Sequence, residues 1–222
     1  MRAGRPVVTE VSSDGAHLLQ VLAEVPVVAV LRHCPIQHVQ RVAETTLEQG
    51  VRMIEVTLDG EDALHQIELL ADALPEAILG AGTVRRVEQV GAAVSAGAQY
   101  LLSPATHAGV LGEAERLDVP FVPGASTATE IERAMDLGAL AVKVFPAEQL
   151  GGPAYLGALR APLHGIPLLP SGGVDATNAA DYMEAGAIGL IVGGQIFSRQ
   201  SMTRGDDRAI SEALRGLLEV LA

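Results

Sequence analysis

Short runs of valine, isoleucine and leucine alternate along the chain with segments whose apolar residues recur every three or four positions. The first pattern is typical of strands buried on both faces, and the second of helices with one apolar face. A helix is predicted first, from the capping residue Ser12 to about residue 23. Eight strands are then predicted at residues 25–32, 53–58, 78–84, 100–104, 120–123, 139–145, 167–170 and 190–192.

The regular alternation of strand and helix predicts an α/β fold with a parallel sheet. Eight strands close naturally into a (β/α)8 TIM barrel, here with an extra N-terminal helix, and an open doubly wound sheet is the alternative. No linker-like stretch or shift in composition interrupts the chain. We therefore expect residues 1–222 to form a single domain, with residues 1–10 as a flexible arm.

Composition narrows the possible partners. The chain is 49% hydrophobic, but only 3% aromatic and without tryptophan, so the core must be aliphatic. A net charge of −12 argues against a nucleic-acid or anionic membrane partner, although a few arginines can still bind a small anion. Cys34 is the only cysteine, and no apolar run is long enough for a spanning helix. These features favour a cytoplasmic protein.

Polar residues follow the apolar runs, where a barrel collects its functional groups. Lys143 is the only lysine of the chain and lies within an apolar run, where a charge is least expected. A lysine can act as a nucleophile toward a carbonyl group, which an arginine cannot do. The alternative is that a general preference for arginine left one lysine by chance. Glu55 lies in another apolar run and is either a proton shuttle or an ion-pair partner of Arg32 or Lys143.

Anion-binding groups are expected at the same edge of the sheet. The glycine pairs Gly172-Gly173 and Gly193-Gly194 follow the last two predicted strands, where many barrels bind phosphate through backbone N–H groups. Arg32 and Thr83 end two other strands and suit a carboxylate, or are a surface arginine and a satisfied hydroxyl. The six histidines have no metal-ligand spacing, so no metal is expected. If Lys143 itself reacts with a carbonyl group, no organic cofactor is needed either.

Several motifs together resemble one enzyme family, from about residue 25 to the C-terminus. They are Ile54-Glu-Val-Thr-Leu58, Gly80-Ala-Gly-Thr-Val84, Ser103-Pro104, Val122-Pro-Gly124, Lys143-Val-Phe-Pro-Ala-Glu148, Pro170-Ser-Gly-Gly-Val174 and Gly193-Gly194. Their order and spacing are similar to those of the 2-keto-3-deoxy-6-phosphogluconate (KDPG) and 4-hydroxy-2-oxoglutarate (KHG) aldolases.

The resemblance implies a metal-independent class I aldolase, typically a homotrimer, in which Lys143 forms the Schiff base and Glu55 is the general acid and base. It implies that the pyruvyl end of a small keto-acid substrate is lined by Arg32, Thr83, Pro104 and Phe145. The far end, a phosphate where present, would be held by Ser171, Gly172, Gly173, Gly193 and Gly194.

Three positions depart from the family pattern. Asp59 and Gln195 stand where an arginine and a serine are frequent, and Ser171 replaces a common threonine. We predict an aldehyde-lyase that cleaves a 2-keto-4-hydroxy acid, such as KDPG or KHG, to pyruvate and an aldehyde. The alternatives are a metal-using barrel lyase or epimerase for sugar phosphates and a barrel that binds a keto acid or phosphate without catalysis.

Overall fold

The computed structural model describes residues 12–222, so the predicted arm at residues 1–10 lies outside the described part. The strands are β1 (Val27–Leu31), β2 (Met53–Thr57), β3 (Ile78–Gly82), β4 (Tyr100–Leu102), β5 (Phe121–Val122), β6 (Gly124–Ala125), β7 (Val142–Val144), β8 (Leu168–Pro170) and β9 (Leu190–Val192). The helices are α1 (Ser13–Glu24), α2 (Ile36–Glu48), α3 (Ala63–Ala73), α4 (Val87–Ser95), α5 (Ala108–Arg116), α6 (Ala128–Asp136), α7 (Gly152–Arg160), α8 (Ala179–Glu184), α9 (Arg199–Arg204) and α10 (Asp207–Glu219).

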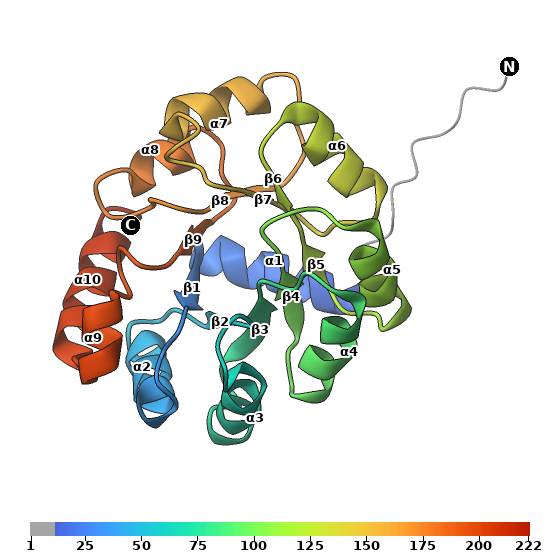
Figure 1. Ribbon diagram of the computed structural model, residues 1–222. Coiled ribbons are helices and arrows are strands. Elements are labelled where there is room, and N and C mark those ends of the chain that lie inside the picture. Colours follow the sequence, from blue (N-terminus) through green and yellow to red (C-terminus); the bar gives the residue numbers. More distant parts are fainter. Residues whose placement is uncertain (1–11) are drawn as a thin grey trace, which may run out of the picture.

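All strand pairs are parallel, and the sheet curls inside a ring of helices (Figure 1). Six strands pair in the order β5-β4-β3-β2-β1-β9, and β6-β7-β8 form a second sheet. A bridge between Ser171 and Ile191 joins the end of β8 to β9. The described residues thus form one α/β domain around a curled parallel sheet, which confirms the predicted α/β class. A closed eight-stranded barrel stays a prediction.

The strand predicted at residues 120–123 corresponds to β5, and a further short strand, β6, follows directly after Pro123. Proline has no N–H group to donate to a neighbouring strand, so the ladder is interrupted there. The Pro123 carbonyl still accepts the Lys143 N–H at 2.9 Å. β5 pairs with β4, whereas β6 pairs with β7. The chain therefore changes its pairing partner at this proline, and β6 is a strand that the sequence did not predict.

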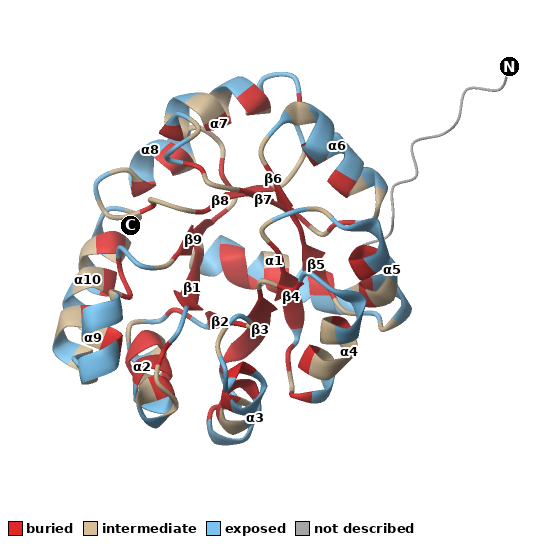
Figure 2. Cartoon of the chain, viewed as in Figure 1, coloured by how far each residue is buried: buried red, intermediate tan, exposed pale blue. Residues whose placement is uncertain are grey.

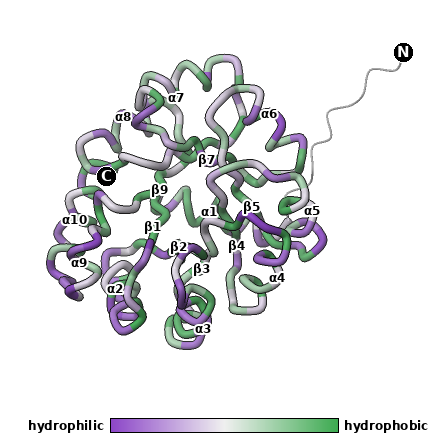
Figure 3. Tube along the Cα trace, in the orientation of Figure 1, coloured by the Kyte–Doolittle hydropathy of each residue, from purple (hydrophilic) through white to green (hydrophobic). Residues whose placement is uncertain are grey.

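Apolar residues form two layers, one on each face of the curled sheet. On β2, for example, Met53 joins the inner cluster, whereas Ile54 and Val56 join the outer cluster under the helices. Figure 2 shows the strands buried along their length, and Figure 3 shows hydrophobic residues concentrated in the strands and hydrophilic ones on the outer helices. This two-sided burial explains why the strands read as nearly continuous apolar runs.

Helix α1 packs across the start of the strands. The Ser12 side chain accepts a hydrogen bond from the Gly15 N–H at 3.2 Å and so caps the helix. Leu18 and Leu22 belong to the inner cluster together with Val28 and Met53, which are among the first inner residues of β1 and β2. Burying such side chains contributes about 1.5–3 kcal/mol each. Helix α1 therefore closes the N-terminal end of the inner layer.

The helices and the single cysteine bear on membrane insertion and on thiol chemistry. Within residues 12–222, no helix combines the length and apolar character that crossing a bilayer requires. The only cysteine, Cys34, is buried with a free thiol, and burial raises its pKa to about 12. At neutral pH this thiol is protonated and packed as a small apolar group.

Candidate functional site

The inner face of the sheet changes from apolar to polar toward the C-terminal ends of the strands. Successive inward residues lie two positions apart along a strand. Met53 is therefore followed on the inner face by Glu55 and Thr57, and Ala141 by Lys143. Glu55, Thr57 and Lys143 are all buried, with exposed fractions of 0%, 1% and 6%. The two predicted catalytic residues thus face the same enclosed space.

Lys143 occupies the middle of β7, between register partners Gly124 on β6 and Leu169 on β8. Its Nζ lies 5.6 Å from the centroid of the Phe145 ring, within the range of a cation–π contact. No carboxylate of residues 12–222 lies within salt-bridge distance of Nζ. The amine is therefore held by β7 next to an aromatic face and is free of a competing ion pair.

Glu55 is fully buried, and neither carboxylate oxygen has a hydrogen-bond partner among the described residues. The ion pairs with Arg32 and Lys143 that were considered for it do not form there. The carboxylate lies over Gly82 of β3, where a Cβ atom would come within 1.6 Å of Oε1. Most buried polar groups in proteins are hydrogen-bonded, so such an exception needs an explanation. Here the glycine makes the room that the carboxylate occupies.

Two further inner hydroxyl groups share this condition and were not among the predicted site residues. The hydroxyls of Thr57 and Tyr100 are buried without a hydrogen-bond partner in the described chain. Tyr100 starts β4, and both burial and the nearby Glu55 carboxylate raise the pKa of its phenol well above its ordinary value. The sequence alone predicts that Tyr100 is an aromatic residue of the core. Only its neighbours in the fold place it in the site.

Arg32 and Thr83 do lie together, as predicted, at the ends of β1 and β3. One Arg32 nitrogen donates to the Thr83 hydroxyl at 3.2 Å, and the other is paired with the Asp59 carboxylate. Thr83 has a φ of 60°, a left-handed value that is uncommon for a residue with a β-branched side chain. The guanidinium is therefore clamped between the ends of β2 and β3.

The charge on Asp59 is favoured by this clamp. Its partial burial opposes ionisation, but the dipole of the nearby Thr57 hydroxyl, which forms no hydrogen bond to it in this geometry, and the positive charge of Arg32 outweigh burial and lower the pKa of Asp59 below its ordinary value. The imidazole of His33 also lies 3.6 Å from the carboxylate. Asp59 was singled out from the sequence as a departure from the family pattern, and its pairing with Arg32 is a structural consequence of that departure.

The loop after β8 is built against the segment after β7. The backbone N–H groups of Ala147 and Glu148 donate to the carbonyls of Ser171 and Gly172, at 2.8 and 3.1 Å. The Phe145 ring lies 3.3 Å from where a Cβ of Gly172 would be. Gly172 and Gly173 have φ values of 89° and 84°, which other residues rarely adopt. Four predicted residues, Phe145, Ser171, Gly172 and Gly173, are thus brought together.

A polar cluster behind this loop was not predicted. Glu148 accepts hydrogen bonds from the Tyr182 hydroxyl at 3.2 Å and the Asn178 side-chain amide at 3.3 Å. The same amide donates to the Gly173 carbonyl at 2.8 Å. Burial of Tyr182 and the charge of Glu148 raise the pKa of the Tyr182 phenol. These bonds fix the orientation of the glycine pair from outside the sheet.

The remaining predicted residues form the rest of this edge. Pro104 is half-buried, and its carbonyl carbon would be 2.2 Å from a Cβ of Gly124. The Gly193 carbonyl accepts the N–H groups of Ile196 and Phe197, at 2.9 and 2.8 Å, so the chain turns directly after β9. Gly194 and Gln195 are exposed on this turn.

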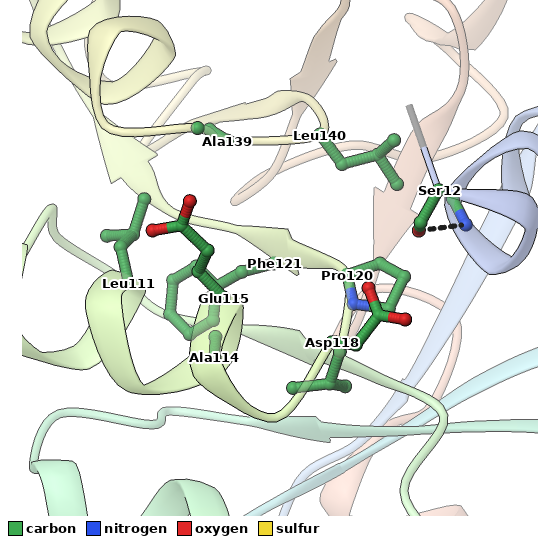
Figure 4. Close-up of a pocket in the computed structure, with 12 residues that line it drawn as sticks. Ser12, Leu111, Ala114, Glu115, Asp118, Pro120, Phe121, Ala139 and Leu140 are labelled. Carbon is green, nitrogen blue, oxygen red and sulfur yellow. Dashed lines mark hydrogen bonds between the residues drawn. The ribbon is translucent and has the colours of Figure 1, made fainter. Parts of the chain in front are cut away.

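A surface pocket lies at the other end of the strands. Figure 4 shows it between α5 and the segments that precede β5 and β7, with Ser12 at one side. Its lining includes Glu115 and Asp118 but none of the predicted site residues. Across residues 12–222, no three histidine, cysteine, aspartate or glutamate side chains gather as metal ligands would.

Comparison with known proteins identifies the family. The family model for KDPG and KHG aldolase matches residues 18–213, most of the chain. The chain belongs to the KDPG and KHG aldolase family. The predicted resemblance is therefore confirmed, and with it the prediction of an aldehyde-lyase that forms pyruvate and an aldehyde from a keto-deoxy acid.

Individual members of this aldolase family agree over nearly their whole length. The 2-dehydro-3-deoxy-phosphogluconate aldolase of Dickeya dadantii is 34% identical over 88% of this chain and 92% of its own. A solved structure described as native KDPGal has 29% identity and a TM-score of 0.83, over 89% of this chain and 95% of its own. The KDPG aldolase of Legionella pneumophila, with pyruvate captured as a covalent carbinolamine, has 26% identity and a TM-score of 0.82, over 93% and 98%.

Proposed function

We propose that this aldolase works through a Schiff base on Lys143, with Glu55 as the group that moves protons. The observation that carries the proposal is the placement of Lys143. The only lysine of the chain is buried on the inner face of β7 and has no carboxylate partner within the described chain. The covalent carbinolamine described for the Legionella pneumophila relative supports the same chemistry here.

In the first half of the reaction, the neutral Lys143 amine adds to the C2 ketone of the substrate. The resulting carbinolamine loses its hydroxyl group as water after a proton arrives from Glu55, and an iminium ion forms. The Glu55 carboxylate then accepts the proton of the C4 hydroxyl while the C3–C4 bond breaks. The electrons of that bond move into the iminium, which gives an enamine and releases the aldehyde.

The second half returns the enzyme to its starting state. Glu55 delivers a proton to C3 of the enamine, which gives the iminium of pyruvate. Water adds to this iminium and gives up one proton to the Glu55 carboxylate, and pyruvate leaves as the Lys143 amine is restored. Each proton that Glu55 gives or takes is balanced over the cycle, so no metal or organic cofactor enters the scheme.

Substrate contacts follow from the groups around Lys143. Arg32 and Thr83 bind the carboxylate next to the ketone, and Pro104 and Phe145 form the walls of the pyruvyl site. Ser171, Gly172, Gly173, Gly193 and Gly194 hold the far end of the substrate, with the two glycine pairs offering backbone N–H groups to an anion. The substrate is a 2-keto-4-hydroxy acid such as KDPG or KHG.

Three finer features belong to the same proposal. Because β5 and β6 are separated by one residue and β8 is bridged to β9, the two sheets are proposed to complete a (β/α)8 barrel, with α1 as an added N-terminal helix. Residues 1–222 are proposed to belong to a single domain. The family resemblance supports a homotrimer. A cytoplasmic location stays a prediction from the sequence.

Trapping tests the proposal directly. Incubation with pyruvate and sodium borohydride should reduce the iminium and add the mass of one pyruvate-derived group to a single peptide, the one that carries Lys143. Lys143→Arg should show no adduct and lose at least a thousandfold in kcat, because the guanidinium stays protonated. An adduct elsewhere, or full turnover by Lys143→Arg, would refute the Schiff-base assignment.

A further inference from the structure

The ring of Tyr100 reaches across a neighbouring strand inside the sheet. Gly80 of β3 pairs in register with Tyr100 of β4 on one side and with Glu55 of β2 on the other. A Cβ atom on Gly80 would lie 2.3 Å from Cζ of the Tyr100 ring and 2.5 and 2.7 Å from its two Cε atoms. The end of the ring that carries the hydroxyl therefore lies over Gly80, and the hydroxyl lies between β4 and the strand that carries Glu55.

The side chain of Glu55, from β2, covers the next inward position of β3. Its carboxylate lies over Gly82, two residues beyond Gly80. Inward positions two apart on a strand are separated by about 7 Å. A phenol over Gly80 and a carboxylate over Gly82 are thus neighbours on one face of β3. No hydrogen bond joins them as they stand, so a contact between them needs rotation of the side chains or a bridging water. Both glycines are required, since a Cβ at either position would displace one of these side chains.

Within the described residues, the hydroxyl of Tyr100 makes no hydrogen bond that would stabilise the fold. The residue is 1% exposed, and among residues 12–222 its hydroxyl has no hydrogen-bond partner. Phenylalanine would fill the same space without burying a polar atom. The same sheet interior holds both unpartnered Glu55 oxygens and the unpartnered Thr57 hydroxyl. Three residues on β2 and β4 therefore bring polar atoms into one enclosed space.

We propose that Tyr100 is a positioning residue for Glu55, holding the carboxylate in its working orientation through a hydrogen bond from the phenol, made directly or through one water. The raised pKa of the phenol supports this role, because a protonated hydroxyl can donate where a phenolate cannot. Tyr100 acts through Glu55 and touches no reacting atom. The proposal rests on the proton-transfer role proposed for Glu55.

The test compares hydroxyl deletions at two of the chain's tyrosines. Tyr100→Phe removes one oxygen from the inner site, and Tyr155→Phe is the matched control, because the Tyr155 hydroxyl donates to the Ser126 carbonyl at 2.5 Å. The readout is exchange of the pyruvate methyl protons in D2O, followed by NMR, which reports enamine formation without any aldehyde. Borohydride trapping with pyruvate is measured in parallel.

Tyr100→Phe should lower the maximal exchange rate roughly tenfold, the size of a hydrogen bond to a charged group. Half-saturation by pyruvate should stay within about twofold, and the melting temperature within about 3 °C. Tyr155→Phe should exchange at the native rate. Introducing Tyr100→Phe into Glu55→Asp should cost less than in the native chain, because a displaced carboxylate no longer meets the phenol.

Three outcomes would overturn the proposal: native exchange by Tyr100→Phe, an equal loss in Tyr155→Phe, or an undiminished effect of Tyr100→Phe in the Glu55→Asp background. Failure of the underlying mechanism looks different. If native protein does not exchange pyruvate protons, or if Glu55→Gln exchanges at the native rate, then the role of Glu55 itself is wrong whatever Tyr100 does.

Discussion

The two halves of the space inside the curled sheet are built on opposite principles. The N-terminal half holds Leu18 and Leu22 of α1 against Val28, Met53 and Ile78, and every one of these side chains is apolar and buried. The C-terminal half holds Lys143, Glu55 and the Tyr100 hydroxyl, and the described chain offers no hydrogen-bond partner to the latter two. Stability is gained in the first half, whereas the second retains polar groups that cost free energy to bury.

This division follows from parallel strands that share one direction. All of them begin at the end that α1 covers and finish at the edge where their loops carry polar residues. A functional group at that edge can therefore be strained or unpartnered without loosening the packing at the other end. Substitutions in the N-terminal half should therefore change stability, whereas substitutions in the C-terminal half should change catalysis.

The largest effect on catalysis without a change of any functional group is expected from Gly82→Ala. The new methyl group would come within 1.6 Å of Glu55 Oε1 and within 2.3 Å of its carboxyl carbon, so the carboxylate must move. A well-placed general acid and base contributes about 10²–10⁴-fold to the rate. We expect kcat for pyruvate proton exchange to fall by at least about a hundredfold, while borohydride trapping and melting report whether the fold persists.

Gly91→Ala in α4 is the matched control for this change. Apart from its chain neighbours and the backbone of its own helix, no atom lies within 4 Å of its Cβ position, and alanine favours a helix over glycine by about 0.5–1 kcal/mol. The control should melt slightly higher and keep native kcat. Native kcat in Gly82→Ala would mean that Glu55 works from a position other than the one over Gly82.

The sequence predicts the sheet well because strands that are buried on both faces appear as short, nearly continuous apolar runs. The runs at residues 53–58 and 78–84 became β2 and β3 with ends shifted by at most two residues. The strand β6, directly after Pro123, was not predicted because it depends on pairing with β7, and pairing is not a local property. Lys143 and Glu55 were singled out because a charged residue within an apolar run can be recognised from its sequence neighbours alone.

The rest of the site depends on the register between neighbouring strands, which short stretches of sequence do not reveal. Gly80 and Gly82 look like ordinary glycines until the register places Tyr100 and Glu55 over them. In the sequence, Tyr100 looks like a core aromatic because its ring fits the pattern of buried apolar residues. That pattern does not indicate what its hydroxyl contacts. Asp59 was noted as unusual, but its pairing with Arg32 spans 27 positions and appears only in the fold.

A perturbation of the apolar half should leave catalysis intact. Leu22 is 3% exposed and lies in the inner cluster, where its Cδ2 is 3.1 Å from the Cβ position of Gly189. Leu22→Ala should lower the free energy of unfolding by about 2–5 kcal/mol and the melting temperature by roughly 10 °C. Below the melting transition, kcat should stay within about twofold, because a packing defect this far from the polar half reaches no functional group.

Leu64→Ala controls for the loss of leucine itself. Leu64 is 39% exposed on α3, so its truncation should change the unfolding free energy by no more than about 0.5 kcal/mol. Chemical denaturation separates the two variants. A large fall of kcat in Leu22→Ala, at a temperature where this variant is folded, would show that packing in the N-terminal half affects catalysis in the C-terminal half.

The smallest effect concerns the edge of the polar half, at Asp59. Its carboxylate occupies one side of the Arg32 guanidinium, and a second carboxylate, that of the substrate, must share this cation. Exposed charge pairs are worth about 0.2–1 kcal/mol, so Asp59→Asn should lower the KM for pyruvate by about two- to fivefold without changing kcat. Glu113→Gln, which removes the same charge from an outer pair with Arg116, should leave the KM unchanged.

The same substitution has a pH signature whose sign follows from the lowered pKa of Asp59. A carboxyl group that is more acidic in the folded than in the unfolded chain stabilises the fold above its ordinary pKa of 3.8, and this contribution is lost as the pH falls through the folded value. The difference in unfolding free energy between native protein and Asp59→Asn should therefore be constant near neutrality and shrink below about pH 4. A higher KM in Asp59→Asn, with the same pH signature, would mean that Asp59 holds Arg32 ready for the substrate rather than competing with it.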